Sequence, residues 1–96
     1  MKLIDVISNI DNINNEAFLY VKKIENQFSI NSETKVLSLE DEELEWKTFE
    51  VTERKCPGFD YFMEVFLIKE FINDLNSSER LEDKCKKLIH YVEFDA

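Results

Sequence analysis

Tyr61-Phe62-Met63-Glu64-Val65-Phe66-Leu67-Ile68 is the most apolar segment of this 96-residue chain, and Glu64 is its only charged residue. A short apolar run of this kind predicts a buried central strand near residues 61–67, followed by a helix near residues 69–76. A second pattern runs through the same residues, because apolar side chains recur at helical spacing at Tyr61, Val65, Ile68, Ile72 and Leu75. One amphipathic helix is therefore an open alternative to the strand and helix that we favour, since length alone does not separate them.

The amino-terminal third predicts a helix and a strand pair. Apolar residues at helical spacing, which are Leu3, Ile4, Ile7 and Ile10, predict a short opening helix. It should end in residues 11–15, where Asp and Asn side chains compete for backbone hydrogen bonds. Two runs of strand-forming residues follow, at 18–21 and 34–39, with Asn31-Ser32 as turn residues between them. These runs should pair as antiparallel strands.

Between the second strand and residue 58, we expect a helix and then a break. Four residues could line one helix face, namely Leu44, Thr48, Val51 and Thr52. The alternation of Phe49 and Val51 also suits a strand, but we favour the helix. Cys56-Pro57-Gly58 should end it, because proline disfavours helix at the residue before it and glycine permits a turn.

The carboxy-terminal residues predict a last helix with Ser78 as its cap. Its buried stripe would consist of Leu81, Cys85, Leu88 and Val92. Only one Gly and one Pro occur, which argues against a turn-dense sandwich or barrel. We therefore expect an α+β fold in a single domain, residues 1–96, with a small antiparallel sheet of about three strands packed against an N-terminal helix and C-terminal helices.

Negative charge is concentrated in one short segment. Five of the six residues from Glu40 to Glu45 are acidic, and residues 37–53 carry seven carboxylates and one lysine, a net charge of −6 out of −9 for the chain. Such a surface repels nucleic acid and anionic membranes and attracts basic proteins. The candidate partner-binding residues are Glu40, Asp41, Glu42, Glu43, Glu45 and Trp46. A solvated loop is the alternative for the acids, and a core position is the alternative for Trp46.

Signatures of catalysis, metal binding and cofactor binding are missing from the sequence. A single glycine leaves no phosphate-binding loop, and the acids lack calcium-loop spacing. His90, the only histidine, falls in the last helix, and Cys56 and Cys85 lack the spacing of a redox pair or zinc site. We therefore expect no enzyme, no catalytic residues, no cofactor and no metal. No signal peptide or membrane-length apolar run is visible, so a cytoplasmic protein without membrane contact is expected.

The order of the expected elements and several short motifs carry a resemblance. The motifs are the Phe18-Leu19-Tyr20 strand, the Phe28-Ser29-Ile30 turn, the Thr34-Lys35-Val36-Leu37 strand and a closing helix that ends Tyr91-Val92-Glu93-Phe94-Asp95-Ala96. Over most of its length the chain resembles the small acidic immunity proteins of contact-dependent growth inhibition and related bacterial toxin systems. Where the family pattern has Pro-Lys after a Leu-Tyr pair and a Trp-Thr turn that leads to the second strand, this chain has Val21-Lys22 and Phe28-Ser29.

The resemblance implies an intracellular inhibitor that binds the toxic C-terminal domain delivered by a neighbouring cell. Such a domain is commonly a nuclease, and the inhibitor blocks its active site or substrate surface. The charge of this chain fits that role, because a nuclease needs a basic groove to hold phosphates. The alternatives are an acidic secretion chaperone or adaptor, which would dimerise and hold an unfolded segment, and a small carboxylate-dependent enzyme.

Overall fold

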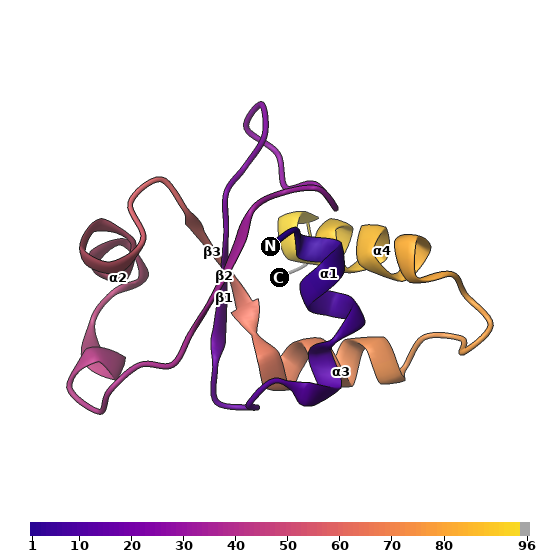
Figure 1. The fold of residues 1–96 in the computed structure, drawn as a ribbon, viewed down its shortest axis with the longest axis horizontal. Coiled ribbons are helices and arrows are strands. Elements are labelled where there is room, and N and C mark those ends of the chain that lie inside the picture. The colour runs from indigo at the N-terminus through magenta and orange to yellow at the C-terminus, as the bar shows by residue number, and fades with distance from the viewer. Residues whose placement is uncertain (95–96) are drawn as a thin grey trace.

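The protein folds around a three-stranded antiparallel sheet, and the computed structural model describes residues 1–94 (Figure 1). The strands are β1 (Phe18–Val21), β2 (Thr34–Leu37) and β3 (Asp60–Glu64), in the order β2-β1-β3. An N-terminal helix and C-terminal helices pack with this sheet. The predicted α+β fold is confirmed.

Helical segments cover both faces of the sheet (Figure 1). On one face lie α1 (Leu3–Ser8), the 3-10 turn η1 (Ile10–Asn12), α3 (Val65–Asn73) and α4 (Leu81–Phe94). On the other face lie the 3-10 turn η2 (Glu43–Glu45) and α2 (Thr48–Lys55). The sheet is thus the middle layer of three.

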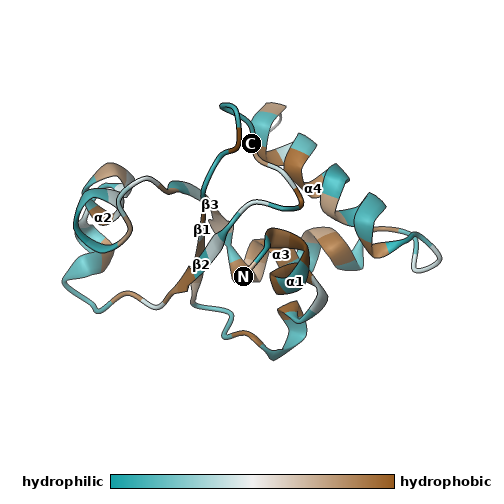
Figure 2. Ribbon diagram, turned by 45° about the horizontal axis from the view of Figure 1, so that its top comes forward, coloured by the Kyte–Doolittle hydropathy of each residue, from teal (hydrophilic) through white to brown (hydrophobic). Residues whose placement is uncertain are grey.

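The main core lies between the sheet and helices α1, α3 and α4. Its fourteen buried residues are Leu3, Val6, Ile7, Ile10, Ala17, Leu19, Val21, Phe62, Met63, Val65, Ile68, Cys85, Leu88 and Ile89. The predicted stripe of the last helix is present in part: Cys85 and Leu88 are fully buried and Val92 is half-buried, but Leu81, at the first turn, is 38% exposed. Figure 2 shows alternating hydrophobic and hydrophilic bands along α4. Burial of these side chains removes apolar area from water and so stabilises the fold.

A second, smaller cluster lies on the opposite face of the sheet, beneath residues 38–59, which we call the lobe. Its four buried residues are Tyr20, Val51, Cys56 and Phe59. Tyr20 comes from the central strand, and its ring meets the Tyr61 ring edge-on, with 5.6 Å between the ring centroids. Five half-buried hydrophobic residues pack against this cluster: Phe18, Leu37, Leu39, Trp46 and Tyr61. The lobe is therefore packed on the sheet through a smaller cluster than the main core.

A β-bulge in β3 divides its apolar side chains between the two cores. The β1–β3 register shifts between Leu19 and Tyr20, so that Leu19 faces Met63 and Tyr20 faces Tyr61. The extra residue lets Phe62 and Met63 both enter the main core, while Tyr61 packs on the lobe side. This explains why the segment lacks the strict alternation of an ordinary half-buried strand.

The connection between β1 and β2 is a hairpin with a strained tip. Ile24 and Gln27 form an isolated antiparallel bridge, and the two residues between them have positive φ angles, 51° at Glu25 and 66° at Asn26. Two positive φ angles in a two-residue loop are typical of a type I′ turn. Glutamate is a poor residue for that conformation, because its Cβ crowds the backbone there.

Strand β3 differs from the prediction in position and length. The most apolar segment was expected to be central, but β1 is the central strand and β3 lies at the edge. The strand also ends at Glu64 and the helix begins at Val65, whose amide donates to the Ala17 carbonyl (3.0 Å). The single-helix alternative is wrong. The apolar content of the segment indicated that both faces of the strand are buried, but it did not indicate the position of the strand in the sheet.

The lobe helix and the end of β2 also need correction. A helix does occupy the region before the Cys56-Pro57-Gly58 break, where the glycine has a φ of 87°. It begins only at Thr48, however, so Leu44 lies outside it and is 53% exposed. Strand β2 ends at Leu37, two residues before the predicted end at Leu39.

The last helix is present, but its predicted cap is wrong. The amide and the hydroxyl of Ser78 both donate hydrogen bonds to the Asn76 side-chain oxygen, each at 2.9 Å, in a turn before the helix. The helix begins at Leu81, and the Arg80 carbonyl accepts the Lys84 amide (3.0 Å). The end of the closing helix was expected at Asp95-Ala96, which lies outside the described residues. Among residues 1–94, no helix is both long enough and apolar enough to cross a membrane.

Candidate partner-binding site

The acidic loop, residues 40–45, lies in the lobe, away from the main core (Figure 1). Four of its carboxylates are exposed, namely Glu40, Asp41, Glu42 and Glu45. They are held on an ordered turn, because the amides of Glu43 and Leu44 both donate to the Glu40 carbonyl, at 2.9 and 3.0 Å. The structure therefore presents these four acids to solvent at defined positions.

Glu43 has an internal role that the sequence did not reveal. One carboxylate oxygen lies 2.7 Å from the Lys55 ammonium at the end of α2, and the other accepts the Glu40 amide at 2.8 Å. The hydrogen bond from Lys55, followed by that from the Glu40 backbone, holds the pKa of this carboxyl below its ordinary value. Glu43 thus ties the acidic loop to α2, while the other four acids remain unpaired with α2.

Trp46 serves the lobe as packing. Its side chain is half-buried and packs against the lobe cluster. The guanidinium of Arg54 lies over its ring, 4.7 Å from the centroid, in a cation–π contact. The core interpretation of Trp46 accounts for these contacts, and any partner would meet a ring already covered on one face by Arg54.

A groove of about 380 Å³ opens beside the acidic loop, and we call it the acidic groove. Its lining combines three apolar side chains with three acids: Phe18, Leu39, Leu44, Glu16, Asp41 and Glu64. Among the described residues, no lysine or arginine lines it. The groove therefore joins an apolar surface to uncompensated negative charge.

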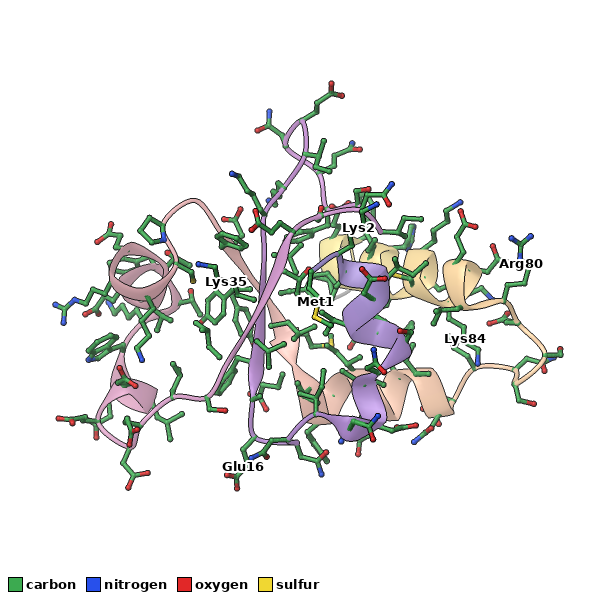
Figure 3. All side chains as sticks on the ribbon, viewed as in Figure 1. Met1, Lys2, Glu16, Lys35, Arg80 and Lys84 are labelled. Atoms are coloured by element: carbon green, nitrogen blue, oxygen red, sulfur yellow. The ribbon has the colours of Figure 1, made fainter. Side chains whose placement is uncertain are left out.

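Three separate segments supply the acids of this groove. Asp41 comes from the acidic loop, whereas Glu64 ends β3 and lies directly across from Phe18 in the β1–β3 register. Residues directly opposite each other in an antiparallel pair share a sheet face, so Glu64 stands beside the Phe18 ring. Glu16 precedes β1, and Figure 3 shows it at the lower end of the sheet in that view.

Backbone hydrogen bonds fix Glu16 and Glu64 relative to each other. The amide of Val65 donates to the Ala17 carbonyl at 3.0 Å, and the amide of Phe66 donates to the Asn15 carbonyl at 3.2 Å. These bonds tie the start of α3 to the turn that carries Glu16. Sequence reasoning missed both glutamates; the one available signal was a lone charge, Glu64, inside the most apolar segment.

The two cysteines and the single histidine lie in different surroundings. Both cysteines are buried and free, and burial raises the pKa of each thiol, that of Cys85 to about 11. His90 is exposed on α4 with its ring 4.8 Å from that of Phe94. Within residues 1–94, no group of three or more His, Cys, Asp or Glu side chains is arranged to hold a metal ion.

A larger and more open hollow of about 650 Å³ lies between the hairpin tip, α2 and the end of α4. Charges of both signs line it, since Lys23, Asp60 and Glu93 all contribute. It offers no uniform electrostatic signal for one class of ligand. The acidic groove is therefore the better candidate site.

Comparison with known protein families, with curated proteins and with solved structures finds no match to this chain.

Proposed function

We propose that this protein is a cytoplasmic immunity protein that binds one basic toxin domain, a nuclease, and occludes its active site or substrate surface. The observation that carries the proposal is the acidic groove with its adjoining acidic loop. Together they form a surface with four exposed loop carboxylates and a groove that, within residues 1–94, no basic side chain lines. No catalytic step and no cofactor belongs to this proposal.

The physical reason is charge complementarity. A nuclease holds phosphates with lysine and arginine, so its substrate surface is basic. Carboxylates placed opposite those cations attract the enzyme over about one Debye length, roughly 8 Å at physiological salt, and then compete with the phosphates. The net charge of −9 also disfavours direct binding of this chain to nucleic acid.

The cognate domain would be sought in the reading frame next to the gene, as the variable C-terminal domain of a large secreted protein. Purified toxin domain is then titrated with this protein. Inhibition by occupancy predicts that residual toxin activity falls linearly and reaches its floor at equimolar mixing. Full inhibition of the toxin domain at a small fraction of the equimolar amount of this protein would contradict inhibition by occupancy and would favour an enzymatic function. A stable dimer of this chain that binds only unfolded toxin would favour a secretion chaperone.

The role of the acidic loop is tested by charge reversal that spares Glu43, because that residue supports the loop. The variant replaces exposed loop acids only: Glu40→Lys, Glu42→Lys and Glu45→Lys. Its association with the toxin domain should be at least about ten-fold slower at low salt, and added salt should slow the wild type more than the variant. Stopped-flow fluorescence or surface plasmon resonance measures both rates.

A matched control reverses three exposed acids on the opposite side of the sheet. These are Glu70 and Asp74 at α3 and Asp83 in α4. The control has the same net charge as the loop variant, so it should associate within about three-fold of the wild-type rate if local charge governs encounter. Equal slowing of both variants would show that only total charge matters and would refute this role for the loop.

A further inference from the structure

The acidic groove has the shape and chemistry to receive one long cationic side chain. Its volume of about 380 Å³ is near the lower limit for sites that bury a small ligand. The apolar part consists of Phe18, Leu39 and Leu44, and the acids stand around it. An arginine or lysine stem can cover such an apolar surface while its charged end meets carboxylates.

Three carboxylates along one groove give it a negative potential. Asp41 and Glu16 are exposed, whereas Glu64 is half-buried. In the free protein no lysine or arginine of the described chain lines the groove to offset them. A partner cation would be attracted by this potential, which makes the groove complementary to positive charge and not merely hydrophobic.

Arginine suits the groove better than lysine for two reasons. Its planar guanidinium can bond two carboxylates at once through paired N–H groups, whereas an ammonium acts as a point charge. It also stacks on aromatic rings, and Phe18 lies directly across the sheet from Glu64, so an aromatic face and a carboxylate are adjacent.

We propose that the acidic groove binds an arginine side chain of the basic partner. The arginine stem packs on Phe18, Leu39 and Leu44, and its guanidinium bonds to Asp41 and Glu64. This inference rests on the proposed function and names the contact that anchors the complex. The exposed loop acids would then speed encounter, and the groove would slow dissociation.

The groove is tested first without the partner. Isotope-labelled protein is titrated with N-acetyl-arginine amide and followed by NMR, with N-acetyl-lysine amide and uncharged N-acetyl-norleucine amide as comparisons. The arginine amide should bind with a Kd of about 1–10 mM, at least about three-fold tighter than either comparison, and shift the resonances of the groove residues. Equal binding of the lysine or norleucine amide would overturn the assignment of arginine, and so would shifts scattered over the surface.

Variants separate the groove from the general negative field. Asp41→Asn with Glu64→Gln should weaken arginine-amide binding at least about five-fold, because both guanidinium partners lose charge. The matched control is Glu53→Gln with Asp60→Asn, which removes the same charge from exposed residues outside the groove. It should change the affinity less than two-fold. Equal weakening by the two variants would refute the groove, provided that circular dichroism shows both folded.

The same two variants in the toxin complex distinguish the two proposals. The groove variant should speed dissociation of the toxin domain about ten-fold or more, whereas the control should not. If the toxin domain dissociates from the wild type and the groove variant at the same rate, the arginine-binding role of the groove is refuted, while the proposed immunity function is not. If the arginine amide binds in the groove but this protein inhibits no basic toxin, the proposed function is refuted, while the arginine-binding role of the groove is not.

Discussion

Replacing Leu88 with alanine tests whether the lobe opens independently of the main core. Leu88 is fully buried in α4, among the fourteen buried residues of the main core, whereas the lobe has four. Removing a leucine side chain from such a site costs about 3 kcal/mol, from lost burial and the cavity left behind. For a domain of this size the melting temperature should fall by about 15 °C.

The two cysteines report on the two cores separately, because Cys85 belongs to the main core and Cys56 to the lobe cluster. A buried thiol reacts with a labelling reagent only after its surroundings open. When reclosing is fast, the labelling rate follows the free energy of that opening. A loss of about 3 kcal/mol in the main core should therefore speed Cys85 labelling by roughly 100-fold.

Labelling of Cys56 should change less than about three-fold, because a local opening of the lobe leaves Leu88 packed in both states. The assay uses single-thiol proteins made with Cys56→Ala or Cys85→Ala, each with and without Leu88→Ala, under native conditions. Leu81→Ala is the matched control in the same helix, since Leu81 is 38% exposed and its removal should cost less than about 1 kcal/mol. Equal acceleration of both thiols by Leu88→Ala would show that the lobe and main core open together, and the reasoning would be wrong.

Three further predictions concern the lobe core, the ion pair and the hairpin. In urea unfolding, Val51→Ala should lower the free energy of unfolding by about 2 kcal/mol. The control Val36→Ala, at a site 39% exposed, should lower it by less than about 0.5 kcal/mol. Similar losses in the two variants would contradict a packed lobe. Glu43→Gln should destabilise the protein above pH 4.5, and the difference in unfolding free energy between wild type and variant should shrink as the pH falls. The reason is that a carboxyl with a lowered pKa in the folded state stabilises that state only while it is ionised. A constant difference from pH 7 to pH 3 would argue against the ion pair. Glu25→Gly should raise the melting temperature by about 3 °C by relieving the left-handed strain, and a decrease measured by calorimetry would count against that strain.

Local patterns in the sequence determined much of the fold. The apolar spacing at Leu3, Ile4 and Ile7 specified the opening helix, although it ends at Ser8 and not in residues 11–15, and Ile10 begins a separate 3-10 turn. The two runs of strand-forming residues specified the β1–β2 pair. The Cys56-Pro57-Gly58 break and the stripe through Cys85 and Leu88 were also readable. In each case the signal comes from residues within a few positions of one another, where helix period, strand alternation and turn preference act directly.

The candidate site was readable only in part. The density of carboxylates from Glu40 to Glu45 marked the acidic loop, but it could not separate Glu43, which pairs with Lys55, from its exposed neighbours. That difference depends on where the end of α2 lies relative to the loop. Composition reports how much charge a segment carries, whereas pairing depends on the position of a residue twelve places away in the chain.

Tertiary structure alone decided the position of β3 at the sheet edge and the lining of the acidic groove. A bulge in the β1–β3 register sends Phe62 and Met63 into one core and leaves Glu64 beside Phe18 on the other face. Glu16 and Asp41 reach the same groove from separate turns. Strand order and register follow from pairing between distant segments, and because side chains alternate between faces, a shift of a single residue would have placed Glu64 on the opposite side of the sheet.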